Sequence, residues 1–353
     1  MGALDRVDRL CATDLDERAL RVALLAELRA RFGFDSYAWL LTDPQTCVGT
    51  APVAAVPSIA DLPTLIRLKY QTPVNRWTSL APGTAATTLL AATGSNPSRS
   101  LVWAELLCRY AVTDVANLVF ADQYGCWGFL DLWRCGGTFT PAEVAALAGF
   151  ARVVTGALRS RIAGTFATDP ARSFPSDEPV VLLLDADLRL LDQTRQADAF
   201  LRALLPGPGE AAPIPAAAYN VAAQLLARRA DVDNHPARAR AHLSDGLWVT
   251  LSAAWLGATH PPGPAIAVTI EPTTGEQRSA LFARAIGLSR RETQLLDHLI
   301  EGASTHELAQ RLYLSEHTVQ DHLKSIFAKT GVHSRRTLVA RATGGTSAEP
   351  SQQ

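Results

Sequence analysis

The chain has 353 residues with a net charge of −1, and 48% of them are hydrophobic against 19% charged. This composition is typical of a globular protein with two or three domains. The apolar runs stay shorter than about 18 residues, which argues against a membrane-spanning helix. The N-terminus lacks the basic patch and apolar core of a secretory signal. We therefore expect a cytoplasmic protein without a membrane partner.

The cysteines are odd in number and widely spaced, with no C-x-x-C pair: Cys11, Cys47, Cys108, Cys126 and Cys135. This spacing argues against a disulfide framework or a zinc ribbon. We expect reduced thiols that pack as small hydrophobic side chains. A redox-sensing cysteine is the alternative, and it would need an exposed thiol with a depressed pKa.

The C-terminal segment is the basic part of the chain. Residues 281–341 hold nine of the 33 Lys and Arg residues but only six of the 34 Asp and Glu residues. They also hold two of the three lysines and five of the eight histidines. This modest excess of positive charge fits phosphate binding at that end of the chain.

Residues 14–163 have the pattern of an α+β sensor domain. Leucines at 20, 24, 25 and 28 follow the spacing of one helix face. Thr140 precedes Pro141 as the expected N-cap of a long closing helix. The predicted elements are helices at 14–31, 59–70, 98–109 and 141–161, and strands at 36–41, 115–121 and 127–134.

A resemblance in this first region points to a sensor fold. The string from Trp127 to Arg134, followed by Phe139-Thr-Pro-Ala-Glu143, resembles the end of a GAF domain. The resemblance implies a sheet that wraps a small-molecule pocket. The candidate ligand-binding residues are the aromatic side chains Trp39, Trp103, Phe120, Trp127 and Phe129. A pocket filled by its own side chains is the alternative, because a fold does not by itself establish a function.

Residues 178–272 form a second α+β region. An apolar strand from Pro179 is followed by a turn at Asp185–Asp187 and a second strand. Helices at 196–205 and 216–229 come next, and then strands at 237–243, 247–256 and 265–271. Asp245-Gly246 predicts a tight hairpin turn between the first two of these strands. The order of two strands, helices and three strands resembles a PAS domain.

Polar, proline-rich stretches separate the regions. The first linker is expected at 165–179 and the second at 272–277, and the polar tail after Thr343 predicts disorder. The fold class is thus a multidomain α+β chain that ends in an all-α domain.

Residues 281–343 predict four short helices in a helix-turn-helix arrangement. Serines occupy the expected N-caps of the four helices: Ser289, Ser304, Ser315 and Ser334. The first two complete capping-box patterns with Glu292 and Glu307. Val319, Leu323, Ile326 and Phe327 give the third helix an inward apolar stripe.

The outward face of that third helix is polar. It carries Glu316, His317, Gln320, Asp321 and Lys324, which can reach base edges and phosphates in a major groove. Lys329, Arg335 and Arg336 flank the helix, where contacts to the DNA backbone are expected. For His322, beside the apolar stripe, we expect a packing or capping role instead. The predicted partner is double-stranded promoter DNA.

The segment resembles the LuxR-type (GerE) helix-turn-helix family. The matching residues are Leu288, Ser289, Arg291, Glu292, Leu295, Leu296, Gly302, Ser304, Glu307, Leu308, Ala309, Leu312, Ser315, Thr318, Val319, His322, Lys324, Ile326, Lys329, Gly331, Val332, Ser334 and Arg335. The family implies that the third helix enters the major groove and that the fourth helps a homodimer form on DNA. His306 and Thr330 depart from it, standing where lysine and leucine are frequent, and the first puts one backbone contact in doubt.

The resemblance also implies roles for individual residues. Gln320, Asp321 and Lys324 would face bases, while Thr318, Lys329 and Arg335 would face phosphates. The whole predicted DNA-binding set is Ser304, Thr305, Ser315, His317, Thr318, Gln320, Asp321, Lys324, Lys329, Ser334 and Arg335.

Other functions lack their motifs. No P-loop occurs, and Lys69 is badly placed for a phosphoacceptor receiver domain. Trp39, Asp43 and Pro44 give only a faint likeness to acyl-homoserine-lactone-binding relatives. With no nucleophile elbow, zinc-ligand spacing or paired carboxylates, we expect neither an enzyme nor a metal or cofactor.

Two hypotheses for control follow. In the first, a dimeric regulator is gated by a small molecule or another signal sensed by residues 14–163 and 178–272, which requires different affinities for two states. In the second, DNA binding is constitutive, and these domains only dimerise, through the helix at 141–161, or bind a protein partner. RNA polymerase is a further expected partner.

Overall fold

The computed structural model describes residues 3–80, 83–167, 178–204, 215–244, 246–257 and 265–345. The chain divides into two compact units. The first comprises Met1–Leu158, Ser176–Ala241 and Val249–Glu271, and the second comprises Arg159–Pro175, His242–Trp248 and Pro272–Gln353.

The first unit contains an antiparallel five-stranded sheet with the order β2-β1-β5-β4-β3. Its strands are β1 (Ser36–Thr42), β2 (Gly49–Ala55), β3 (Ala86–Thr88), β4 (Asp114–Asp122) and β5 (Gly125–Arg134). The three strands expected from the sequence are confirmed as β1, β4 and β5. Strands β2 and β3 were not predicted, because β2 includes Gly49 and Pro52 and β3 is only three residues long.

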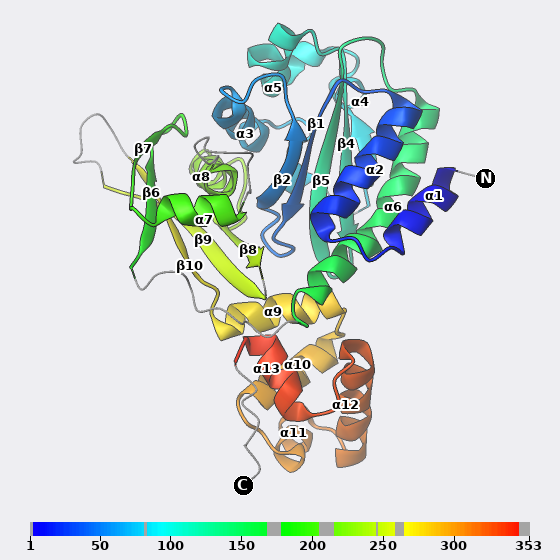
Figure 1. Ribbon diagram of the computed structural model, residues 1–353, viewed down its shortest axis with the longest axis vertical. Coiled ribbons are helices and arrows are strands. Elements are labelled where there is room, and N and C mark those ends of the chain that lie inside the picture. The colour runs from blue at the N-terminus through cyan, green and yellow to red at the C-terminus, as the bar shows by residue number, and fades with distance from the viewer. Residues whose placement is uncertain are drawn as a thin grey trace. The chain divides into compact units, whose positions relative to one another are not determined.

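One face of this sheet is covered by helices, which Figure 1 shows beside it: α1 (Ala3–Cys11), α2 (Glu17–Phe32) and α6 (Pro141–Gly164). Asp16 caps α2 by accepting a hydrogen bond from the amide of Ala19 at 2.7 Å. Phe150 of α6 packs edge-on against Trp39 and Phe120, with ring centroids 6.3 and 6.2 Å apart. These contacts make the α6 face of the sheet part of the core.

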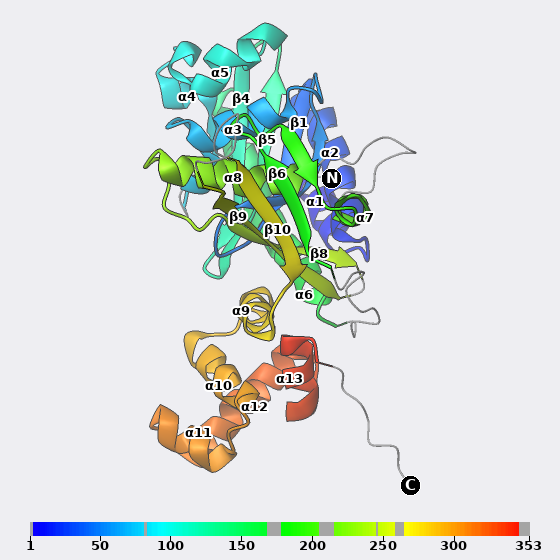
Figure 2. The same cartoon turned by 90° about the vertical axis from the view of Figure 1, so that its left-hand side faces the viewer.

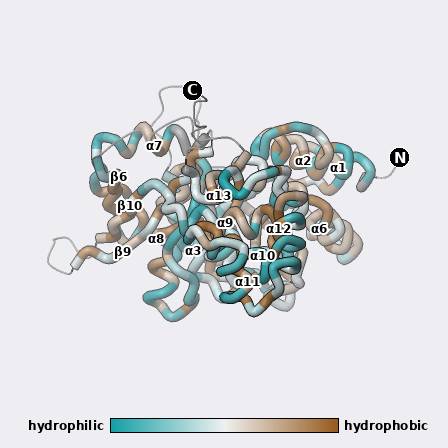
Figure 3. Tube along the Cα trace, turned by 90° about the horizontal axis from the view of Figure 1, so that it is seen from below, coloured by the Kyte–Doolittle hydropathy of each residue, from teal (hydrophilic) through white to brown (hydrophobic). Residues whose placement is uncertain are grey.

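α6 is long and apolar enough to cross a membrane by length and composition alone. Its tube is mostly in hydrophobic and neutral colours in Figure 3. However, Leu147, Phe150, Ala151 and Val154 are buried inside the first unit. This buried stripe is typical of a core helix.

The other face of the sheet carries α3 (Leu62–Gln71), α4 (Leu89–Thr93) and α5 (Leu101–Glu105). The single helix expected at 98–109 is wrong. The chain forms the 3₁₀ turn η2 (Pro97–Arg99), then α5, then the 3₁₀ turn η3 (Leu107–Tyr110). Ser100 caps α5 and Leu106 leaves helical geometry with φ −129°, so the helix ends after five residues.

The second sheet has the order β7-β6-β10-β9-β8, and Figure 2 shows its strands β6, β9 and β10. Its strands are β6 (Val180–Leu184), β7 (Leu190–Gln193), β8 (Arg238–Ser244), β9 (Leu247–Trp255) and β10 (Ile266–Pro272). The expected order of two strands, helices and three strands is confirmed. Gly246 has the positive φ of a hairpin turn, 75°, whereas Asp245 lies outside the described residues.

The helices of this region are α7 (Ala197–Leu204) and α8 (Ala216–Arg229). α8 is buried on most sides, as its alanine-rich sequence allows, and it packs against α3 and β2. A Cβ atom added to Gly49 of β2 would lie 3.0 Å from the Asn220 side chain of α8. The two sheets therefore share one core within the first unit.

The second unit contains α9 (Gly275–Ile286), α10 (Arg290–Ile300), α11 (Thr305–Leu312), α12 (Glu316–Thr330) and α13 (Arg335–Thr343). Phe166, just after α6, stacks on Trp248 with centroids 5.4 Å apart and meets Phe282 of α9 edge-on at 5.4 Å. Arg278 of α9 lies over the Phe166 ring and donates to the carbonyl of Gly246 at 2.8 Å. The unit thus extends beyond the expected boundary of 281–343. Most of the linker expected at 165–179, and the tail from residue 346, lie outside the described residues.

Candidate nucleic-acid interface

The first two helices of the segment begin with the capping boxes expected from the sequence. The Ser289 hydroxyl accepts from the amide of Glu292 at 3.3 Å, and the Glu292 carboxylate accepts from the amide of Ser289 at 2.6 Å. Ser304 and Glu307 repeat this exchange at 3.3 and 2.7 Å. Each box satisfies amides that would lack partners at a helix start. Both capping boxes are confirmed.

A tight turn joins α11 to α12. Tyr313 ends α11 in the left-handed conformation, with φ 53°, and its side chain is 95% exposed. Ser315 then caps α12 by accepting from the amide of Thr318 at 3.1 Å. This turn reverses the chain within three residues, so that α12 crosses α11 closely, as a helix-turn-helix requires.

α12 has two distinct faces. Val319, Leu323 and Ile326 are buried against the neighbouring helices. The opposite face is exposed and polar, and it carries Glu316, His317, Gln320, Asp321 and Lys324. The inward stripe fixes the rotation of α12 about its axis, so these five side chains project away from the core together.

Ion pairs organise the exposed face. Lys324 Nζ lies 3.1 Å from Asp321 Oδ1, and His317 Nε2 lies 3.6 Å from Asp321 Oδ2. The hydrogen bond from Lys324 lowers the pKa of Asp321. His306 of α11 pairs with Glu316 at 2.9 Å. The face therefore presents donors and acceptors in fixed relation, which is what base-edge recognition needs.

Lys329 has a partner that the sequence did not indicate. Its Nζ lies 2.6 Å from the Glu292 carboxylate and 3.2 Å from the carbonyl of Gly287. Ser325 donates to the same carboxylate at 2.7 Å. Burial alone would raise the pKa of Glu292, but the bonds from Lys329 and Ser325 lower it to about 2. Lys329 thus has a structural role in joining α12 to α10.

The remaining predicted residues lie at helix starts. Arg335 donates to the Thr305 hydroxyl at 2.6 Å, which connects α13 to α11. Ser334 caps α13 by accepting from the amide of Thr337 at 3.1 Å. Ser304, Ser315 and Ser334 therefore act as caps, and their exposure leaves them available to a phosphate as well.

The five candidate ligand residues lie on both sides of the first sheet. Trp39 and Phe120 stack on each other at 5.0 Å on the α6 side of the sheet. Trp103 packs on the opposite side, where its indole donates to the carbonyl of Val112 at 2.7 Å. Trp127 donates to Asp122 at 2.9 Å, and Phe129 is buried in the sheet.

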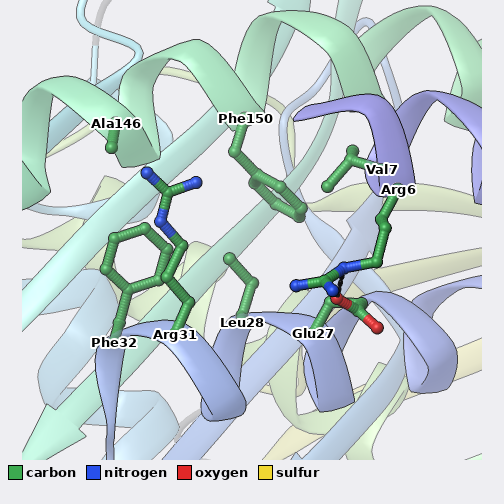
Figure 4. Close-up of a pocket in the computed structure, with 8 residues that line it drawn as sticks. All are labelled: Arg6, Val7, Glu27, Leu28, Arg31, Phe32, Ala146 and Phe150. Carbon is green, nitrogen blue, oxygen red and sulfur yellow. Dashed lines mark ion pairs between the residues drawn. The ribbon is translucent and has the colours of Figure 1, made fainter. Parts of the chain in front are cut away.

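A small cavity with a mixed apolar and polar lining lies between the sheet and α3. Its lining includes Lys69, Asn75, Asn117 and Asp131, and its volume is about 20 Å³. Lys69 pairs with Asp131 at 2.9 Å, and Asn117 donates to Asp131 at 2.6 Å. Figure 4 shows a second cavity, of about 30 Å³, between α1, α2 and α6, where Arg6 pairs with Glu27 at 2.9 Å.

Metal ligation has no candidate in the part of the chain that the structure describes. No group of three or more His, Cys, Asp or Glu side chains is placed there to hold a metal ion. 

The capped helices α10–α13, the tight turn at Tyr313 and the polar face of α12 define a helix-turn-helix protein. The chain belongs to the luxR family of bacterial regulatory proteins, which its residues 287–342 match. Over 52 residues it is 35% identical to the spore germination protein GerE of Bacillus subtilis strain 168, which covers 15% of this chain and 70% of GerE.

Other regulators match this chain over a stretch of similar length. The CsgBAC operon transcriptional regulatory protein of Escherichia coli strain K12 is 42% identical over 55 residues, which are 16% of this chain and 26% of that protein. The chain thus matches about a quarter of the length of that regulator. A crystal structure of Escherichia coli SdiA aligns over 97% of both chains with 11% identity and a TM-score of 0.32, a likeness too distant to carry an argument.

Proposed function

We propose that this chain is a transcription regulator that binds DNA sequence-specifically through α12 and acts as a homodimer. The observation that carries the proposal is the polar face of α12, held outward by the buried stripe of Val319, Leu323 and Ile326. The luxR family match supports it, because it covers all four helices around this face. The proposal includes a cytoplasmic location, because the protein would have to reach DNA there.

Residue roles within the interface are part of the same proposal. Gln320, Asp321 and Lys324 read bases, since they lie one helical turn or less apart on the exposed face. Thr318 and Arg335 hold phosphates at the ends of this surface. Lys329 contributes less to DNA than the family pattern implies, because Glu292 already neutralises it.

Selection from a random duplex pool tests the proposal. The full chain should enrich one sequence motif, and a two-fold-symmetric motif would support a dimer. A duplex carrying the motif should bind at least about a thousandfold more tightly than a scrambled duplex of equal composition. Failure to enrich any motif, with the chain folded by circular dichroism, would overturn the proposal.

In one form of the proposal, a small molecule controls DNA binding. In the second, the protein binds DNA constitutively. The two cavities described above, of about 20 and 30 Å³, suit one or two waters, whereas pockets for small molecules measure roughly 300–1,000 Å³. A gating ligand that binds at either of these cavities would have to open the first unit as it binds. The protein can be extracted with organic solvent to remove any bound small molecule. An identical DNA affinity before and after extraction would favour constitutive binding.

A further inference from the structure

Cys47 lies in the loop between β1 and β2, in an unusual backbone conformation. Its φ is 59°, a value that residues other than glycine rarely adopt. Asp43 imposes this geometry: its carbonyl accepts from the Cys47 amide at 2.9 Å, and its carboxylate accepts from the amide of Gln45 at 2.9 Å. Such conformations persist where the surroundings determine them, and they gather at functional sites.

The loop is attached to the second sheet within the first unit. Arg240 of β8 donates hydrogen bonds from Nε and Nη2 to the Asp43 carboxylate, at 2.6 and 2.7 Å. The Thr46 hydroxyl donates to the carbonyl of Arg238 at 2.7 Å. These bonds bring the segment just before β8, which contains Asp233 and His235, against the loop.

Two reactive groups lie close to the Cys47 side chain. The Cys126 thiol, at the start of β5, and the His235 ring both lower the pKa of the Cys47 thiol. The backbones are close as well, because the amide of Cys126 donates to the carbonyl of Pro44 at 3.3 Å. Cys47 is partly exposed and Cys126 is buried.

His235 is itself oriented by a buried carboxylate. Its Nδ1 lies 2.7 Å from Asp233 Oδ1, and Asp233 is 2% exposed while the His235 side chain is 38% exposed. Arg76 and the Thr78 hydroxyl hold the other Asp233 oxygen. The bond to Asp233 raises the pKa of His235 to about 10. The ring is therefore an imidazolium at neutral pH.

The same contacts act on the sulfur. The nearby Cys126 thiol, and then the His235 ring, lower the pKa of Cys47 to about 6 against the effect of burial. In turn, the nearby Cys47 and its own burial raise the pKa of the Cys126 thiol. A lowered pKa on the partly exposed sulfur and a raised pKa on the buried sulfur match an attacking and a resolving cysteine.

We propose that Cys47 is a hydroperoxide-reactive cysteine, with the His235–Asp233 pair as its proton donor and Cys126 as its resolving thiol. The presence of a second thiol beside Cys47 favours redox chemistry over acyl transfer, because disulfide formation requires a second thiol and acyl transfer does not. Metal binding is disfavoured, since these side chains are not among any group placed to hold an ion in the described residues. The site does not involve the DNA-binding helices.

The chemistry balances with hydrogen peroxide as the oxidant. The Cys47 thiolate attacks one peroxide oxygen, the O–O bond breaks, and the departing oxygen takes a proton from the His235 imidazolium and leaves as water. Cys47 is then a sulfenic acid. The Cys126 sulfur attacks the Cys47 sulfur, the S–O bond breaks, and the thiol proton ends on the departing hydroxide as a second water. Two thiols become one disulfide, and the peroxide is reduced to two waters.

The expected increase in the rate of reaction with peroxide comes from His235 rather than from the ionisation of Cys47. At pH 7 a thiol of pKa about 6 holds about 30 times more thiolate than one of pKa about 8.5. However, the nucleophilicity of the thiolate falls by about 10–20-fold over the same change in pKa. The net gain is only about twofold. A positioned proton donor adds about a hundredfold or more, so the His235–Asp233 pair is the decisive feature.

Disulfide mapping tests the proposal directly. The full chain is reduced, freed of reductant without oxygen, mixed with one equivalent of hydrogen peroxide, and alkylated for peptide mass spectrometry. We expect a Cys47–Cys126 disulfide, while the exposed Cys108 and Cys135 remain alkylated. Oxidation of Cys108 or Cys135 ahead of Cys47 would overturn the proposal.

Variants separate the three roles. Cys126→Ser should stop at a Cys47 sulfenic acid that dimedone captures, and Cys47→Ser should leave Cys126 a thiol. His235→Asn should slow peroxide consumption at least tenfold and move the midpoint of Cys47 alkylation upward from about pH 6. Cys108→Ser is the matched control and should change nothing. An unchanged rate in His235→Asn would also contradict the assignment. If Cys126→Ser does not fold, the wild-type disulfide map and alkylation profile still decide.

Discussion

The Glu292 carboxylate lies 2.6 Å from the Lys329 ammonium group, and this contact joins the first turn of α10 to the last turn of α12. The Glu292 side chain is 4% exposed and that of Lys329 is 35% exposed. One carboxylate therefore closes a capping box and also fixes the helix that we propose to read DNA.

Glu292→Gln should destabilise the second unit by about 2 kcal/mol at pH 7, because it leaves Lys329 without its charged partner while water offsets part of the loss. The folded pKa of about 2 lies below the ordinary value of 4.5. The stabilisation is thus fully present above about pH 4.5 and is lost as the pH falls from there toward 2. Urea unfolding at pH 7 and pH 3 measures this loss of stability.

Glu301→Gln, at an exposed position, is the control. Equal urea midpoints for Glu292→Gln and wild type at pH 7 would contradict the prediction.

Lys324→Met and Lys329→Met should affect different properties: the first should lower DNA affinity and the second should lower stability. Lys324 is 71% exposed on the face that we propose to enter the groove, so its loss should weaken binding to the selected duplex by about 1–3 kcal/mol and leave unfolding unchanged. Lys329→Met should lower the free energy of unfolding and change DNA affinity less. Fluorescence anisotropy over a range of salt concentrations, beside urea unfolding, distinguishes the two. The assignment of the two lysines is refuted if their effects are reversed.

The Cys47–His235 pair should make the stability of the first unit nearly independent of pH between about 6.5 and 9. His235 has a folded pKa of about 10 against an ordinary 6.5, so its contribution is full below pH 6.5 and is lost as the pH rises toward 10. Cys47 has a folded pKa of about 6 against 9.0, so its contribution grows from pH 6 to 9. The two slopes oppose each other. The ionisable groups around the pair include Asp233, Asp43, Cys126 and Tyr70, together with Arg76 and Arg240, which pair with the two aspartates.

Cys47→Ser should remove the compensation. Because Asp233 is the main cause of the raised pKa of His235, the variant should lose stability steadily from pH 6.5 to 9. The slope should stay below about 1.4 kcal/mol per pH unit, since solvent screens the His235 ring, which is 38% exposed. Urea midpoints at half-unit steps of pH measure the slope under reducing conditions. Cys135→Ser serves as the control. A flat profile in Cys47→Ser would show that His235 does not carry the charge assigned to it.

What could be predicted from the sequence is what depends on neighbours in the chain. The capping boxes at Ser289 and Ser304 were predictable because both partners lie three residues apart, and the apolar stripe of α12 was predictable because a helix has a fixed period. The strands β1, β4 and β5 stood out for their β-branched and aromatic residues. The predicted helix at 98–109 failed because Ser100 and Leu106 redirect the backbone locally.

The contacts that the sequence could not reveal join residues far apart in the chain. Lys329 and Glu292 are 37 residues apart, and Arg240 and Asp43 are 197 residues apart. The spacing of Cys47 and Cys126 indicated only free thiols, because the fold alone brings them together with His235. Alternation along the strands, by contrast, is local, and it sends Trp39 and Asp131 to opposite faces of the sheet.

The buried pair of Lys69 and Asp131 gives a last test of the first unit. The two side chains are 6% and 2% exposed, their charged atoms lie 2.9 Å apart, and Trp77 and Asn117 donate to the Asp131 carboxylate. Asp131→Asn should cost about 3–5 kcal/mol of unfolding free energy, because Lys69 would remain charged and buried without its counterion. Lys69→Met combined with Asp131→Leu should recover most of that loss, since the desolvation cost disappears together with the ion pair. Urea unfolding of both variants decides, with Glu105→Gln as an exposed control. If the double variant is as unstable as Asp131→Asn, the stabilisation of the first unit at this site comes from the hydrogen bonds of Trp77 and Asn117 rather than from the charge of Lys69.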